Sequence, residues 1–152
     1  MKEKKRIINI DESWISETGF IRKVWAKKDG RGNINLSAVT PRLSMIAALD
    51  TEGRVWFSLA HATTNSDVIA LFMKNLMNSL DQESPGWQEN TVFLFDNATY
   101  HKSVETVRFF SRWGLQVIFS GPYSYSAAPT ETLFSGLKYG ELNTDNLPTG
   151  KR

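Results

Sequence analysis

Short apolar runs recur along the chain, separated by polar turns, and predict five strands. Two of these runs flank Asp50-Thr-Glu-Gly53, a short turn that ends in glycine, and therefore predict a β-hairpin. The five runs are residues 6–11, 43–49, 54–59, 91–95 and 115–119. The fourth run is almost entirely apolar, which is typical of a strand buried on both faces.

Three further segments carry apolar residues at helical spacing. The first follows Asn65-Ser-Asp67, which offers an N-cap side chain and a first-turn acid. Its apolar positions are 68, 69, 72, 73, 76, 77 and 80. The second segment extends from Ser103 to Trp113. The third begins near Pro129, since proline is tolerated in a first helical turn, and its apolar side is formed by Leu133, Phe134 and Leu137.

The order strand, hairpin, helix, strand, helix, strand, helix predicts an α/β fold. We expect a mixed sheet with an antiparallel hairpin and parallel strands, flanked by helices. A chain of 152 residues is long enough for one core of ordinary size and too short for two. No internal repeat or linker interrupts the pattern, so we expect residues 1–152 to form a single domain.

Composition narrows the kinds of site that the chain can hold. The absence of cysteine excludes a disulfide framework, a thiol nucleophile and a Cys-based zinc site, and two histidines leave little for a His-rich one. No apolar run approaches the roughly 18 residues of a membrane span. The basic N-terminus leads directly into a strand, unlike a secretory signal. We therefore expect an intracellular protein that does not bind membranes.

Charge is distributed unevenly. Residues 1–42 carry ten Lys and Arg against five acids, whereas residues 43–137 carry five against nine. A basic arm beside an acidic centre suits a polyanion-binding edge around a carboxylate site that binds cations. A solvated surface with uneven charge gives the same pattern, so charge alone leaves both interpretations open.

Three carboxylates carry the candidate chemistry. Asp11 and Asp96 stand at the carboxyl ends of apolar strands, where open α/β sheets bind ligands, and Glu131 lies in the first turn of the last helix. Each also has a structural explanation, as the cap of a turn or of a helix dipole. If the three acids lie at one crevice, their negative charges repel one another unless cations are bound between them. Oxygen ligands without His or Cys suit Mg²⁺ or Mn²⁺. Two such ions can activate a water or a 3′-hydroxyl for attack on a phosphodiester.

The residues around these acids form longer motifs at fixed spacing. They are Ile10-Asp11-Glu-Ser-Trp14, Phe95-Asp96-Asn-Ala-Thr-Tyr-His101-Lys-Ser103, and Pro122-Tyr-Ser124 through Pro129-Thr-Glu131 to Leu137-Lys138. Together they resemble the catalytic core of mariner-type DDE transposases, a superfamily that includes bacterial insertion-sequence relatives. The 34 residues between Asp96 and Glu131 match the spacing of one large branch. The resemblance extends from about residue 6 to residue 140.

This resemblance implies a ribonuclease-H-like fold in which Asp11 and Asp96 bridge two Mg²⁺ ions, with Mn²⁺ as a substitute, and Glu131 completes the ligand set. It implies a DDE-class transposase or integrase catalytic domain. Such domains cleave DNA at transposon ends and join the ends to target DNA by phosphoryl transfer. Related transposases usually act as dimers, so a homodimer is expected. The location follows the host: the nucleus in a eukaryote, the cytoplasm in a bacterium.

Two features depart from the family pattern. Ala128 occupies the position of a family Asn, which removes hydrogen bonds that could brace the loop before Glu131 but removes no ligand. The chain also lacks the helix-turn-helix domains that normally precede this core, and it ends 21 residues after Glu131. We therefore expect a catalytic core alone, truncated at its C-terminal end.

Other polar residues are secondary candidates. Asn97 and His101 follow Asp96 closely, and they either orient a metal-bound water or a phosphate or hold the loop after the strand. Lys138 lies two helical turns after Glu131 and either contacts a phosphate or is solvated. The basic residues Lys27, Lys28 and Arg31 are candidates for sequence-independent contacts with the DNA backbone.

Two other functions are open at this point. A domesticated, catalytically silent descendant would serve as a DNA- or protein-binding module, and a ribonuclease-H-like nuclease would act on RNA–DNA hybrids or junctions. The intact acids argue against a silent descendant, whereas Ala128 and the missing domains argue for it. Binding of Mg²⁺ or Mn²⁺ separates the silent module from an enzyme, and competition among nucleic-acid substrates separates the two enzymes.

Overall fold

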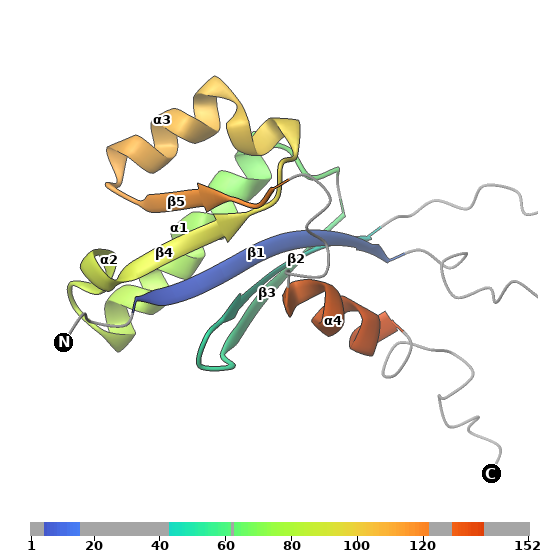
Figure 1. The fold of residues 1–152 in the computed structure, drawn as a ribbon. Coiled ribbons are helices and arrows are strands. Elements are labelled where there is room, and N and C mark those ends of the chain that lie inside the picture. Colours follow the sequence, from blue (N-terminus) through green and yellow to red (C-terminus); the bar gives the residue numbers. More distant parts are fainter. Residues whose placement is uncertain (1–4, 16–42, 62, 122–128, 139–152) are drawn as a thin grey trace, which may run out of the picture.

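The computed structural model describes residues 5–15, 43–61, 63–121 and 129–138. Its centre is a five-stranded sheet in the order β3-β2-β1-β4-β5 (Figure 1). The strands are β1 (Arg6–Ile15), β2 (Leu43–Asp50), β3 (Val55–Ala60), β4 (Thr91–Phe95) and β5 (Gln116–Phe119). The β2–β3 hairpin pairs antiparallel with β1, and β4 and β5 continue the sheet in parallel. The predicted mixed sheet is confirmed.

In the described parts of the chain, three longer helices and two short ones accompany the sheet. They are α1 (Ser66–Glu83), α2 (Trp87–Asn90), the 3₁₀ helix η2 (Thr99–Lys102), α3 (Val104–Arg112) and α4 (Pro129–Gly136). The three longer helices confirm the sequence prediction. The two short ones were not predicted, because four residues are too few to show helical periodicity. Among the described residues, no helix has the length and apolar character needed to cross a membrane.

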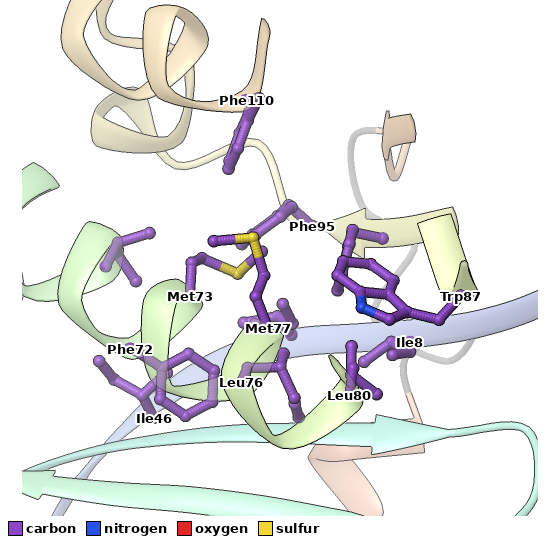
Figure 2. Close-up of a cluster of buried hydrophobic side chains, with 14 residues drawn as sticks. Ile8, Ile46, Phe72, Met73, Leu76, Met77, Leu80, Trp87, Phe95 and Phe110 are labelled. Atoms are coloured by element: carbon purple, nitrogen blue, oxygen red, sulfur yellow. The ribbon is translucent and has the colours of Figure 1, made fainter. Parts of the chain in front are cut away.

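The main core lies between the sheet and α1. Ile8 and Ile10 alternate along β1 and point to this face, where they are fully buried with Phe93 and Phe95 of β4. The side of α1 that faces them is apolar at every turn, from Ile69 to Leu80, and Trp87 and Phe110 close the cluster (Figure 2). The helical spacing seen in the sequence is therefore the buried face of α1.

A second, smaller core lies on the opposite face of the sheet. Met45 and Ala47 of β2 pack there against Phe134 of α4, which crosses this side of the sheet (Figure 1). Because side chains alternate along a strand, β1 presents Asn9 and Asp11 to the α4 face. The chain thus places its first candidate acid on the same side of the sheet as the helix that carries the last one.

The Asn65→Ala variant is expected to lose about 1 kcal/mol of stability, because Asn65 caps α1. Its side-chain oxygen accepts hydrogen bonds from the amides of Asp67 and Val68 at 3.1 and 3.0 Å. Asn78→Ala makes the same change at an exposed position of the same helix and serves as the control. Urea unfolding of both variants measures the cost. Equal stability of the two variants would show that the cap contributes nothing.

Candidate active site

The first two candidate acids lie on neighbouring parallel strands. β1 pairs with β4 from Arg6↔Thr91 to Asn9↔Leu94, so Asp11 lies just beyond the parallel ladder and Asp96 directly follows β4. The prediction that Asp11 ends its strand was wrong. β1 continues to Ile15 because antiparallel pairing with β2 extends that far, although pairing with β4 stops at Asn9. Asp11 nevertheless stands where the sheet opens between β1 and β4.

Asp11 is a partly buried carboxylate surrounded by negative charge. Its pKa is raised to about 6, chiefly by burial. The charges of Glu12 and Asp96 also raise it, while the hydrogen bonds from the Glu12 amide and the Thr130 hydroxyl lower it in part. Its Oδ1 accepts the Glu12 amide at 2.8 Å, and its Oδ2 lies 3.3 Å from the Thr130 hydroxyl. The effect of Asp96 on this pKa shows that the two predicted acids share one electrostatic environment.

Asp96 begins the loop after β4 and is half exposed. Its Oδ1 accepts the Ala98 amide at 2.9 Å and lies 3.2 Å from Nε2 of His101. The contact with His101 lowers the pKa of Asp96, and the Ala98 hydrogen bond lowers it further against the opposing effect of burial. Both contacts are made by Oδ1, so this acid is held ionised and oriented from one side.

A buried network of His101, Glu12 and Tyr100 holds Asp96. His101 was a secondary candidate from the sequence, whereas Glu12 and Tyr100 were not predicted. His101 is fully buried, and its Nε2 lies 3.4 Å from Oε1 of Glu12 as well as close to Asp96. Tyr100 donates its hydroxyl to Oε2 of Glu12 at 2.8 Å. Burial alone would lower the pKa of His101, but the two carboxylates raise it to about 9, so the imidazole is positively charged at neutral pH. This cation offsets part of the local negative charge.

The sequence did contain a signal for Glu12. In β1 the side chains of Ile8, Ile10 and position 12 share one face by alternation, and that face is the main core. An acid at the end of a buried apolar series needs a partner. Tyr100 and His101, which follow β4 in the sequence, are the partners of Glu12.

Glu131 stands apart from the first two acids. It is exposed in the first turn of α4, whereas the preceding Thr130 is fully buried against β1. Within residues 5–15, 43–61, 63–121 and 129–138, no three His, Asp or Glu side chains lie close enough to hold one metal ion. The structure therefore brings Asp11 and Asp96 together and places Glu131 on the adjoining helix α4. The three acids do not form one group of metal ligands in this structure.

The secondary candidates have different surroundings. Asn97 donates to the Ser120 carbonyl and accepts from Lys102, so its contacts hold the loop after β4, as in the structural alternative for this residue. His101 is buried, which favours the same alternative. Lys138 reaches β1, where its Nζ donates to Ser13 Oγ at 2.5 Å. The predictions for Lys27, Lys28, Arg31 and Ala128 concern residues outside the described ranges.

The donors at the end of β1 and β4 fit a hard divalent cation. Asp11 and Asp96 supply carboxylate oxygens, the ligand atoms that Mg²⁺ and Mn²⁺ prefer. Burial and neighbouring negative charge both raise the pKa of Asp11, and a cation between Asp11 and Asp96 would relieve that repulsion. Asp96 is half exposed and accessible to an incoming ion.

A mixed five-stranded sheet in this order, flanked by helices, is the ribonuclease-H-like fold that the motifs implied. Residues 6–152 match the family described as DDE superfamily endonuclease. The chain belongs to this family, which confirms the predicted resemblance to DDE enzymes. No curated protein matches the chain in sequence.

Solved structures of the Mos1 mariner transposase share the fold. The Mos1 paired-end complex with Mg is 22% identical, with a TM-score of 0.67, over 88% of this chain and 41% of that chain. The Mos1 catalytic domain is 20% identical, with a TM-score of 0.62, over 88% of this chain and 58% of that chain. The Mos1 strand transfer complex is 22% identical, with a TM-score of 0.63, over 90% and 41%. The chain thus spans less than two thirds of these relatives.

Proposed function

We propose that the chain is the catalytic core of a DDE transposase that cuts DNA strands and transfers their 3′-hydroxyl ends to target DNA. The observation that carries the proposal is the juxtaposition of Asp11 and Asp96 beyond the parallel β1–β4 ladder, in a chain of the DDE endonuclease family. Phosphoryl transfer needs little covalent help from a protein and depends on placing charge around the reacting phosphate.

The proposal assigns Asp11, Asp96 and Glu131 as ligands of Mg²⁺, with Mn²⁺ as a substitute. Two bound ions would activate the attacking oxygen and stabilise the leaving one. Asp11 and Asp96 supply carboxylates from the two central strands, and Glu131 would join them from the first turn of α4. His101 and Glu12 would keep Asp96 oriented without touching the substrate.

DNA is the proposed partner. The neighbouring Mos1 structures are named as paired-end and strand transfer complexes, and one is named with Mg and one with Mn. Two ends held in one complex need two active sites, which supports the proposed homodimer. The proposed location is intracellular, because the substrate is cellular DNA.

The isolated chain is expected to nick supercoiled plasmid in the presence of Mn²⁺ and to stop when EDTA removes the ion. The physical reason is that the carboxylate cluster cannot activate a nucleophile without a cation. Gel electrophoresis of the plasmid and calorimetric titration with Mn²⁺ measure the two steps separately. Mn²⁺ binding to the acids without any nicking would instead indicate a catalytically silent module. Preferential cleavage of an RNA–DNA hybrid would indicate a ribonuclease-like activity.

A further inference from the structure

A buried polar pair connects the third candidate acid to the first two. Asn9 is 5% exposed on β1, and Thr130, the residue before Glu131, is fully buried at the start of α4. The Asn9 Oδ1 accepts the Thr130 hydroxyl at 2.8 Å and the Thr130 amide at 3.3 Å. Buried polar groups such as these are normally paired, and here each is the partner of the other.

The orientation of the Asn9 amide is fixed by its neighbours. Its Nδ2 donates to the Leu94 carbonyl of β4 at 3.3 Å, and a carbonyl can only accept. The Thr130 amide can only donate, so it must face the Asn9 oxygen. One side chain therefore connects β1, β4 and α4, the three elements that carry or precede Asp11, Asp96 and Glu131.

The Thr130 hydroxyl has one proton and two oxygens within reach. The Asn9 Oδ1 lies at 2.8 Å and the Asp11 Oδ2 at 3.3 Å. The shorter contact takes the proton, because hydrogen bonds between two oxygens in proteins usually span about 2.5–3.0 Å. Because the Thr130 hydroxyl donates to Asn9, its contact with Asp11 Oδ2 is only a weak one. Both contacts lie on the face of the sheet that α4 covers.

We propose that Asn9 and Thr130 are positioning residues: together they hold the start of α4 on β1 and so set where Glu131 stands relative to Asp11. This inference rests on the function proposed above. Neither residue would contact the ion or the DNA. Their effect would pass through the placement of the neighbouring acids, as for other outer partners of metal ligands.

Thr130→Val tests the pair, because valine keeps the shape and burial of threonine and removes only the hydroxyl. The Mn²⁺ dissociation constant is expected to rise about 10- to 100-fold. Thr130→Ser restores the hydroxyl and should stay within about threefold of wild type. Thr64→Val is the matched control, since Thr64 is also buried and its hydroxyl bonds to Ser44 Oγ at 2.5 Å.

Three measurements separate the outcomes. Mn²⁺ titration by calorimetry gives the affinity, thermal unfolding gives the stability, and amide hydrogen exchange of residues 131–136 in metal-free protein reports whether α4 is held. We expect faster exchange of α4, about tenfold, in Thr130→Val alone, with α1 as the internal reference. Equal losses of Mn²⁺ affinity in Thr130→Val and Thr64→Val would overturn the inference, since they would show general destabilisation.

Failure of the proposed function is distinguishable from failure of this inference. If the wild-type chain binds no Mn²⁺, the proposed function fails, and the exchange of residues 131–136 alone decides whether the pair holds α4. Unchanged exchange in Thr130→Val would then reject the pair as a positioning device. If the wild type binds Mn²⁺ and Thr130→Val binds it equally well, the inference fails while the proposed function stands.

Discussion

The Asp96→Asn variant is expected to lose Mn²⁺-dependent DNA nicking by about a thousandfold or more while remaining folded. Changes to the outer partners of metal ligands already cost about 10- to 100-fold, and removal of a ligand charge costs more. Asparagine has the shape of aspartate and can still accept the Ala98 amide, so the loop after β4 keeps its form. The loss therefore reports the charge of Asp96 and not the geometry of its loop.

Asp67→Asn is the control for this variant. It makes the same chemical change at an exposed acid in the first turn of α1, where the expected effect is limited to a small loss of helix-dipole stabilisation. Rates of plasmid nicking are compared at equal Mn²⁺, and thermal unfolding checks that both variants are folded. Nicking by Asp96→Asn at more than about a tenth of the wild-type rate would remove Asp96 from the active site and overturn its proposed role as a metal ligand.

The fold was predictable because its signals are local and periodic. The apolar face of α1 repeats at helical spacing, the hairpin is marked by Asp50-Thr-Glu-Gly53, and β4 is apolar enough for the centre of a sheet. The end of β1 was not predictable from its apolar run. Polar residues continue the strand beyond Asp11 because they pair with β2, and pairing over that sequence distance leaves no local pattern.

The candidate site was predictable in part. The motifs selected Asp11 and Asp96 as candidates, and the parallel pairing of β1 with β4 explains why these residues, 85 positions apart, share one environment. The partners of these acids were not identified. Glu12 and His101 meet only because β1 and η2 pack on the same face of the sheet, and a single sequence does not show such tertiary contacts. The position of Glu131 depends on how α4 docks, which is a property of the whole fold.

The stability of the fold depends on another buried acid, Asp50, which ends β2 beside the start of β1. Asp50→Asn is expected to lower the free energy of unfolding by about 2–4 kcal/mol. Asp50 has no exposed side-chain surface; its Oδ2 accepts Nε of Arg6 at 2.8 Å, and its Oδ1 accepts the amides of Glu52 and Arg54 at 2.9 and 2.8 Å. Breaking a buried ion pair from one side leaves the other charge uncompensated. Here that charge is Arg6, whose side chain is only 13% exposed.

The cost of Asp50→Asn should depend on pH in a defined direction. Burial alone would raise the pKa of Asp50, but the hydrogen bonds from the Arg54 amide, the Arg6 side chain and the Glu52 amide together hold it below its ordinary value. A carboxyl whose pKa is lowered by folding stabilises the fold above its unfolded pKa, about 3.9, and loses that contribution as the pH falls further. The difference between wild type and Asp50→Asn should therefore be constant from pH 7 to about pH 5 and shrink below it.

Urea unfolding of both proteins across this pH range measures the difference, and the other acids cancel because both proteins contain them. Glu52→Gln is the control, since Glu52 is an exposed partner of Arg54 and such surface pairs contribute about 0–1 kcal/mol. A cost for Asp50→Asn no larger than that of Glu52→Gln would mean that Arg6 finds sufficient compensation in Glu83, which lies 3.5 Å away. The Arg6–Asp50 pair would then not be what anchors the start of β1 to the hairpin.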